Sequence, residues 1–231
     1  MHSDCDFIGV LRPGEVHKYL GRHLPGEFED RSLVEIQHRI QAAWGKFHQY
    51  RWQLTNSNIS VKLRLKLFDA VVSPCVLFGL GALPMYASLR EKVDVTQRKM
   101  LRRIVGWRRI PDEPWDITME RMKTRANDAL EQWPIKAWSD RVILSKWQHA
   151  CRVKKVAPER WVSLACKWQP NHITDPWREY EPYRGGGRPI LKWDDSLVSF
   201  ARAIFHCKWH DNACSNNWES YNECYMRWCS S

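Results

Sequence analysis

Cysteine, histidine and aspartate residues near the C-terminus are the first candidates for chemistry, because all three side chains bind metal ions. The Cys and His candidates are His206, Cys207, His210, Cys214, Cys224 and Cys229. Their spacing lacks the close Cys-x₂-Cys pair of a zinc knuckle, although His206 and His210 lie four residues apart on one face of an expected helix. A reduced, partly buried pair of helices rich in Cys and Trp explains the same residues, so we predict no metal site.

Two further motifs could bind a metal or a phosphate. Trp193-Asp194-Asp195 contains the only adjacent pair of aspartates, but the pair opens a helical pattern, where an aspartate accepts hydrogen bonds from free backbone N–H groups. We therefore expect a helix cap. Gly185-Gly186-Gly187-Arg188 precedes a proline rather than the Lys-Ser/Thr of a phosphate-binding loop, which favours a flexible connector. Neither motif predicts a catalytic residue.

The charge balance favours a polyanionic partner. The chain of 231 residues has 36 Lys and Arg against 26 Asp and Glu, with a net charge of +10 and a pI near 9.3. Nucleic acid is the commonest partner of such proteins, and anionic lipid surfaces produce the same bias. No apolar run approaches the roughly 20 residues of a membrane-spanning helix, so we expect no membrane insertion. Without a secretory signal, the eight cysteines are expected to be reduced, in an intracellular protein of the nucleus or cytoplasm.

The 14 tryptophans have two interpretations. Several follow a basic residue, as in Lys146-Trp147, and such residues could stack on the bases of a single-stranded nucleic acid. Tryptophans at helical spacing, such as Trp133 with Trp138 and Trp161 with Trp168, more often anchor helix packing. We expect packing to account for most of them.

The hydrophobic periodicity predicts a mainly α fold that begins with a β-hairpin. Phe7–Leu11 and Val16–Gly21 are short apolar or alternating runs, with a turn expected at Arg12–Glu15. Helical periodicity then predicts helices over 31–54, 60–72, 88–105, 115–132, 135–155, 159–168, 194–208 and 216–228. Ser32 and Glu35 have the spacing of a capping box at the start of the first helix. Residues 107–115 are an expected linker.

The predicted helix over 88–105 has one apolar and one basic face. Val93, Met100, Leu101 and Ile104 gather on one arc, which we expect to pack against the two preceding helices. The other arc contains Lys92, Arg98, Lys99, Arg102 and Arg103, interrupted only by Glu91. Like charges at i and i+4 destabilise an isolated helix by a few tenths of a kcal/mol per pair, and a bound polyanion would relieve this repulsion. A solvated basic face without a ligand is the alternative.

Four segments together resemble one protein family. They are His17-Lys18-Tyr19-Leu20-Gly21; the pattern of Glu35, Ile36, Arg39, Ile40, Ala43, Trp44 and Phe47; the stretch from Lys62 to Gly79; and the stretch from Gln97 to Trp107. Their order and spacing resemble the downstream part of the reverse transcriptase of non-LTR, LINE-type retrotransposons. In addition, a tail motif of the same open reading frames resembles Arg184, Gly187-Arg188-Pro189, Trp193 and Asp195.

The resemblance covers about residues 5–107 and implies three regions. Residues 1–28 would be the end of the palm, with a hairpin that grips the primer. Residues 29–107 would be a thumb-like three-helix bundle. Residues 108–231 would be a helical C-terminal region with a connector rich in Gly and Pro near 169–189. The expected fold class is therefore mainly α, with an N-terminal β-hairpin, a thumb-like bundle and a further helical segment.

The resemblance also implies an activity whose active site this sequence lacks. Polymerases of this family hold two Mg²⁺ ions on palm carboxylates. Asp4 and Asp6 are the only aspartates before the Tyr19-Leu20-Gly21 segment, and the sequence has no Tyr/Phe-Ala-Asp-Asp turn. We therefore expect a truncated chain that has no cofactor and no polymerase activity in isolation, with the missing palm and fingers domains as further partners.

The expected partner is the backbone of RNA or DNA, bound with little sequence specificity. The residues assigned to this binding are Lys18, Tyr19, Gly21, Arg98, Lys99, Arg102, Arg103, Arg108 and Arg109. Two alternatives stay open. One is a non-enzymatic helical module that binds nucleic acid, and the other is an inert retroelement relic whose charge only keeps it in solution.

Overall fold

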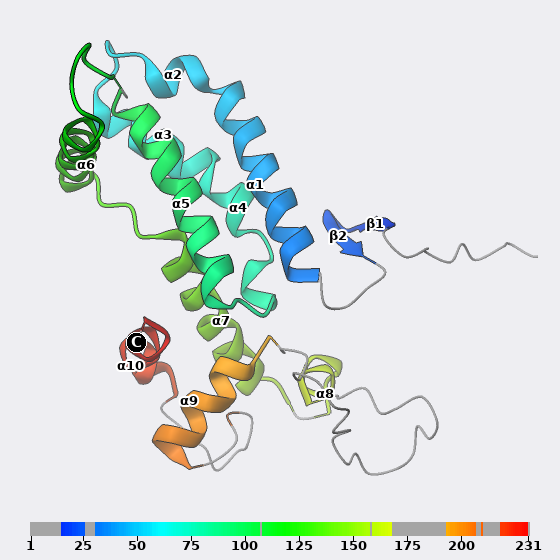
Figure 1. The fold of residues 1–231 in the computed structure, drawn as a ribbon. Coiled ribbons are helices and arrows are strands. Elements are labelled where there is room, and N and C mark those ends of the chain that lie inside the picture. The colour runs from blue at the N-terminus through cyan, green and yellow to red at the C-terminus, as the bar shows by residue number, and fades with distance from the viewer. Residues whose placement is uncertain are drawn as a thin grey trace, which may run out of the picture. The chain divides into compact units, whose positions relative to one another are not determined.

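Helices dominate the structure, a computed structural model that describes residues 15–25, 31–106, 108–157, 159–167, 193–206, 209 and 218–230. A two-stranded antiparallel hairpin precedes the helices (Figure 1). The predicted fold class, mainly α with an N-terminal β-hairpin, is thereby confirmed. The chain divides into two units, one formed by Met1–Leu80 with Met85–Ser139 and the other by Gly81–Pro84 with Asp140–Ser231.

The hairpin pairs β1 (Val16–Tyr19) with β2 (Arg22–Pro25) through a two-residue turn, Leu20-Gly21. Both turn residues have a positive φ, 47° and 76°, as a type I′ turn requires. This hairpin was not predicted, because the sequence pattern placed the turn before Val16 and left Arg22–Pro25 without a strand. The other predicted strand, Phe7–Leu11, and most of its turn lie outside the described residues.

The helices of the first unit follow the hairpin in sequence. They are α1 (Arg31–Gln49), α2 (Arg51–Thr55), α3 (Val61–Val71), α4 (Ser73–Leu77), α5 (Ala87–Ile104) and α6 (Trp115–Gln132). A short 3-10 helix, η1 (Leu80–Ala82), lies between α4 and α5 in the sequence. The helices predicted over 60–72, 88–105 and 115–132 correspond to α3, α5 and α6, with each end within one residue.

Local sequence signals account for two of these boundaries. The Ser60 hydroxyl accepts a hydrogen bond from the backbone N–H of Leu63 and caps the start of α3. Gly106 has a φ of 86° just after the end of α5, a conformation that favours glycine. Pro74 does not end the helical region, because it fits the first turn of the short helix α4, where a missing N–H costs nothing.

The start of α1 differs from the prediction. Because α1 begins at Arg31, Ser32 lies inside the helix and is buried. The Glu35 carboxylate binds the side chain of Arg39 and the backbone N–H of His23, so the predicted capping box is wrong. The predicted continuation of this helix to residue 54 is also interrupted, because α1 ends at Gln49 and α2 is a separate short helix.

Apolar side chains from α1, α3, α4 and α5 line the core of the first unit. Its fully buried members include Ile36, Phe47, Leu65, Phe68, Val76 and Met100. Trp138, the first residue of α7 (Trp138–Lys154), joins this core: its ring stacks on Phe68, and its Nε1 donates to the Ser73 hydroxyl over 2.9 Å. The side chain of Gln97 accepts the backbone N–H of Trp138 and donates to the carbonyl of Lys136. These bonds fix the segment after α6 against α5.

One segment, Val61–Ala82, is long and apolar enough to cross a membrane by length and composition, contrary to the expectation that no run approaches that length. The segment comprises α3, α4 and η1, with turns at Val72 and at Phe78-Gly79. Leu65, Phe68 and Val76 within it are fully buried in the first unit. Packing in a helical bundle therefore accounts for its apolar composition.

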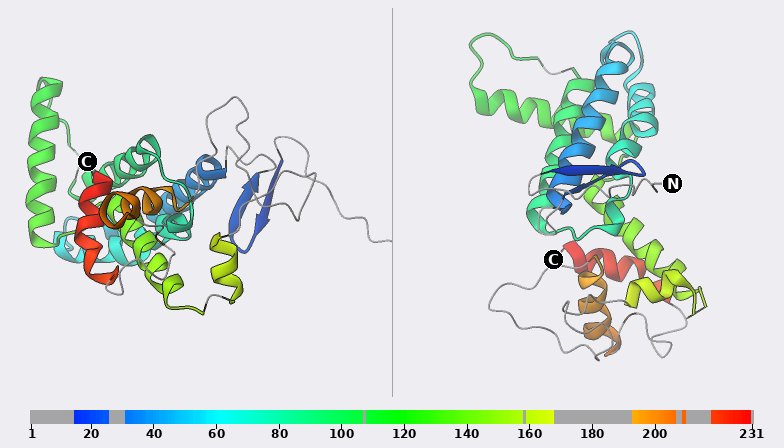
Figure 2. Two further views of the ribbon diagram at one scale, coloured as in Figure 1. Left: turned by 90° about the horizontal axis from the view of Figure 1, so that it is seen from below. Right: turned by 90° about the vertical axis from the view of Figure 1, so that its right-hand side faces the viewer.

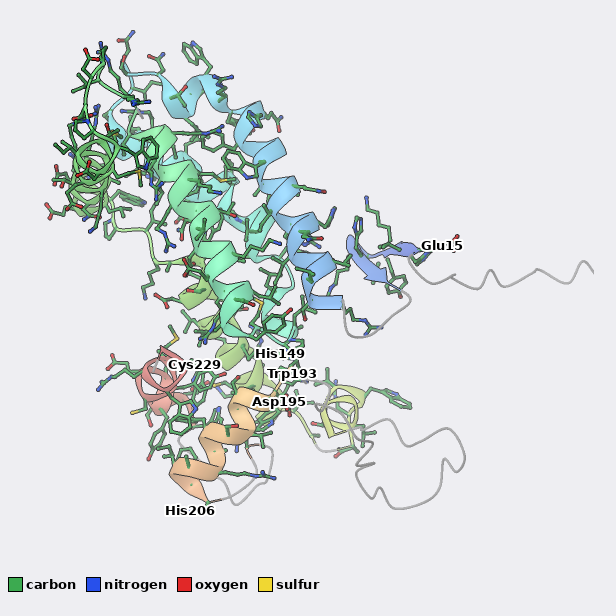
Figure 3. The ribbon with its side chains drawn as sticks, viewed as in Figure 1. Glu15, His149, Trp193, Asp195, His206 and Cys229 are labelled. Carbon is green, nitrogen blue, oxygen red and sulfur yellow. The ribbon has the colours of Figure 1, made fainter. Side chains whose placement is uncertain are left out.

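The second unit contains most of α7 together with α8 (Trp161–Lys167), α9 (Asp195–Phe205), the 3-10 helix η2 (Trp218–Tyr221) and α10 (Asn222–Ser230). Its core is aromatic. The ring of Trp147 stacks on Trp218 at 4.6 Å and on Tyr225 at 4.7 Å between centroids, and Phe200 packs edge-on against it. Trp193 packs edge-on against Trp209 and His149, and Figure 3 shows His149 and Trp193 beside one another. Trp193 of the tail motif therefore contributes to packing.

The Asp194-Asp195 pair lies at the predicted helix start, but its chemistry differs from the prediction. Asp194 is the N-cap residue of α9 and makes no side-chain capping bond. Its carboxylate is buried and instead accepts the Nε1–H of Trp209 over 2.9 Å. At the other end, α9 stops at Phe205 and His206 has a φ of 54°. The predicted helix over 194–208 therefore ends three residues early, and the predicted helix face shared by His206 and His210 is untested because His210 lies outside the described residues.

Packing explains only part of the tryptophan content. Trp138, Trp147, Trp209 and Trp218 are buried, as the packing interpretation predicts. Trp161 is 86% exposed, so its predicted packing role is wrong. Trp168, the connector Gln169–Pro189, Cys207 and Cys214 lie outside the described residues, so the predictions on them are untested. Within the described part of the chain, no group of three or more His, Cys, Asp or Glu side chains could hold a metal ion.

Candidate nucleic-acid interface

The two faces predicted for the third long helix are present on α5. Val93, Met100, Leu101 and Ile104 are buried in the first unit. The basic residues lie on the opposite side of the helix: Lys92, Arg98, Lys99 and Arg103 are exposed, and Arg102 is half-buried. Because the apolar arc fixes the rotation of α5 in the bundle, this sequence pattern determines which of its side chains reach solvent.

The basic residues of α5 divide between two flanks of the helix. The Arg103 guanidinium lies over the Trp44 ring of α1, 4.7 Å from its centroid, so Arg103 belongs to the flank nearest α1. Lys99 and Lys92 precede Arg103 by one and three helical turns and therefore share this flank. Arg98 lies on the other flank, where its guanidinium forms an ion pair with Glu91. We call Lys92, Lys99 and Arg103 the α5 stripe.

The exposed surface of α1 beside this stripe has no carboxylate. Glu35 is the only acidic residue of α1, and its side chain is 1% exposed and bound to Arg39. Gln41 and His48 lie three residues before and four residues after Trp44, so they share its flank of α1, and both are exposed. The His48 ring lies 5.8 Å from that of Trp44 between centroids. The α5 stripe therefore adjoins a neutral, hydrogen-bonding face of α1, with the two helices side by side in Figure 1.

The hairpin packs on the opposite flank of the buried arc of α1. Glu35 accepts the backbone N–H of His23 over 2.7 Å, and Arg39 donates to the carbonyl of Gly21. The His23 ring stacks on that of His38, with centroids 3.7 Å apart, and the pKa of His38 is lowered mainly by burial and also by electrostatic interaction with His23. Figure 2 shows the hairpin against the first turns of α1.

The predicted hairpin residues therefore have two kinds of role. Lys18 and Tyr19 are exposed and available to a ligand. Gly21 is part of the turn, and its carbonyl holds the hairpin on α1. The exposed face of α1 separates Lys18 and Tyr19 from the α5 stripe, so no described contact joins the two sets.

Arg108 and Arg109 lie in the segment between α5 and α6 and are exposed. The carbonyl of Arg108 accepts a hydrogen bond from Arg121 of α6. The same guanidinium binds Glu113, and its hydrogen bond, with a second from Thr118, lowers the pKa of Glu113 to about 2. Arg121 thus holds this segment on α6, and the side chains of Arg108 and Arg109 stay exposed.

The sequence did not predict that α1 contributes to this surface. The sequence pattern placed Trp44 on the apolar arc of the first helix and in the family resemblance, and it assigned no role to Gln41 or His48. A helical wheel does place Gln41 and His48 on the same flank as Trp44. This placement indicates a role only when α5 is known to pack against that flank. The pattern did include Lys92 in the basic arc, although not among the residues assigned to binding.

The described residues thus define a mainly helical protein whose helical bundle has a cationic stripe beside a neutral helix face. No protein-family model matches the chain, and no solved structure matches it. A Caenorhabditis elegans protein, named as transposon-derived and uncharacterized, is 29% identical to the chain over 181 residues. The match covers 78% of this chain and 57% of that protein, so the chain spans little more than half the length of its relative. This similarity points to a transposon origin for the chain.

Proposed function

We propose that the chain derives from the reverse transcriptase of a non-LTR retrotransposon and that its helical bundle binds the backbone of an RNA or DNA template–primer duplex. The segments from His17 to Trp107 that resemble this family support the origin, and the similarity to a transposon-derived protein agrees with it. The function proposed for these residues is binding of the duplex, and it does not include the polymerase step. The palm and fingers domains of the family are the protein partners that this origin implies.

The observation that carries the proposal is the α5 stripe beside the carboxylate-free face of α1. Three cationic side chains project from one flank of a rigid helix, and the buried arc of α5 fixes their direction. Lys and Arg side chains bind phosphates through their charge, and this binding releases counterions from the nucleic acid. Gln41 and His48 of α1 add hydrogen-bond donors and do not repel a polyanion.

The test uses the two lysines of the stripe, because Arg103 also packs on Trp44 and its loss would disturb the bundle. The variant Lys92→Gln/Lys99→Gln should bind a blunt duplex more weakly than the parent, and the slope of log K against log salt should fall by about 2. The matched control is Lys123→Gln/Lys136→Gln, which removes the same charge from exposed positions elsewhere in the first unit.

The control double variant should keep the parent slope, and the circular dichroism of both variants should match that of the parent. Equal slopes for the stripe variant and the parent would overturn the assignment. If both double variants lose affinity equally, net charge rather than this surface accounts for binding.

A further inference from the structure

The end of the helical bundle opposite the hairpin exposes a tryptophan that packing does not explain. Trp52 of α2 is 69% exposed, whereas Leu54 of the same short helix is fully buried. Because successive residues of a helix point about 100° apart, Leu54 directs α2 into the bundle and Trp52 away from it. In Figure 1, α2 lies at the end of α1 that is distant from the hairpin.

The exposed residues near Trp52 in the sequence are mostly polar or basic. We call them, with Trp52, the α2 tip: Arg51, Trp52 and Thr55 on α2, Ser57 and Asn58 in the following connection, and Lys62 and Leu63 in the first turn of α3. Contacts of α2 with α1, α3 and α5 hold the tip to the bundle. It is therefore a surface built mainly on helices, and it includes one exposed aromatic ring.

The tip is remote from every carboxylate of the helices that contact α2. Between Glu35 and Asp69 the sequence has no acidic residue and has six Lys or Arg. At about 1.5 Å per helical residue, Glu35 lies about 20 Å from the end of α1, and Asp69 about 12 Å from the start of α3. In α5, which ends at Ile104, the nearest carboxylate is Asp94, about 15 Å from that end. A polyanion therefore meets no repulsion from these helices at the tip.

We propose that the α2 tip binds an unpaired segment of the nucleic acid, with one base stacked on Trp52 and the adjoining phosphates near Arg51 and Lys62. An exposed indole presents a flat π face to any base, and base–aromatic stacking tolerates every sequence. This inference rests on the proposed function and extends it. The ligand would be a duplex with a single-stranded extension, whose paired part lies on the α5 stripe and whose unpaired part reaches the tip.

The experiment compares two ligands by fluorescence anisotropy: a blunt duplex labelled with a dye, and the same duplex with a short single-stranded overhang. The parent chain should bind the overhang ligand more tightly. Trp52→Ala should weaken binding of the overhang ligand about ten-fold and leave the affinity for the blunt duplex and the salt slope unchanged, because indole has no charge. Trp52→Phe should retain most of the affinity, and Trp52→Leu, which keeps apolar area but cannot stack, should behave like Trp52→Ala.

Three results would overturn the stacking role. They are an unchanged affinity of Trp52→Ala for the overhang ligand, full affinity of Trp52→Leu, and an equal loss on the blunt duplex. Binding of the parent to anionic phospholipid vesicles that Trp52→Ala abolishes would instead assign the tip to a lipid surface. Trp161→Ala, which removes an even more exposed ring from the second unit, should bind both ligands as the parent does.

The two proposals fail independently. If Lys92→Gln/Lys99→Gln leaves the blunt-duplex affinity and slope unchanged, the duplex surface on α5 is wrong. The difference between overhang and blunt ligands in the Trp52 variants then still decides the role of the tip.

Discussion

Removing the Glu35 carboxylate tests how the hairpin is held on the bundle. The side chain is 1% exposed and accepts hydrogen bonds from Arg39 Nε and from the backbone N–H of His23, each over 2.7 Å. The Arg39 guanidinium is itself buried, lies over the Phe78 ring and binds the carbonyl of Gly21. Glu35→Ala would therefore leave a buried cation without its counter-charge and a strand N–H without its acceptor.

The expected loss of stability is large. Breaking a buried ion pair from one side costs about 3–5 kcal/mol, and we expect Glu35→Ala to lower the free energy of unfolding by about 3 kcal/mol. Glu35→Gln should cost about half as much, because its amide oxygen still accepts one hydrogen bond while the charge is lost. Urea denaturation followed by circular dichroism measures these changes, and hydrogen exchange of residues 16–25 should accelerate in both variants.

A double-mutant cycle with Arg39→Ala isolates the pair. The double variant should lose less stability than the sum of the single variants, because neither charge is then left unpaired. A loss under about 0.5 kcal/mol for Glu35→Ala, or unchanged exchange in the hairpin, would refute the proposed anchoring of the hairpin by this buried pair.

Three further predictions concern a pKa, a thiol and an activity. The hydrogen bond from Arg121 lowers the pKa of Glu113 to about 2, so its charged form stabilises the fold above the unfolded pKa of about 4.5 and this contribution is lost as pH falls toward 2. Glu113→Gln should flatten the pH dependence of the melting temperature in that window. Burial raises the pKa of Cys151 to about 11, so peptide mapping after alkylation of the native protein at pH 8 should find Cys224, which is exposed, modified well before Cys151. The isolated chain should extend no primer with Mg²⁺ or Mn²⁺, and template-dependent extension that Asp194→Asn/Asp195→Asn abolishes would contradict both this prediction and the structural role of the pair at the start of α9.

The long helices could be predicted from the sequence because each has a local signal and a buried face that agree. In α5, the apolar arc, the basic arc and Gly106 all indicate one helix ending near residue 104, and the structure agrees. The hairpin had weaker signals. Composition marked a turn at Arg12–Glu15, most of which lies outside the described residues, and it did not indicate the turn at Leu20-Gly21, whose two positive φ angles are properties of the backbone.

The prediction about Asp194-Asp195 shows a different limit. Position in the sequence placed the pair at the start of a helix, and this was correct. It could not show that Trp209, fifteen residues later, would supply an indole N–H to the buried carboxylate. A buried carboxylate favours a partner that donates, and a long-range donor replaces the local backbone N–H groups when the fold brings it close. Local pattern therefore predicts where an element begins more reliably than what its first side chains bind.

The basic arc of α5 shows why the sequence could suggest an interface but could not delimit it. A helical wheel places five cationic residues on one side of the helix, and it does not distinguish Arg98 from Arg103. In the bundle, Glu91 neutralises Arg98, and Trp44 holds Arg103 on the flank beside α1. Packing against α1 therefore distinguishes Lys92, Lys99 and Arg103 from the other cations of the arc. For this reason charge removal at Lys92 and Lys99 tests binding more cleanly than neutralising the whole arc, which would also break contacts that the bundle needs.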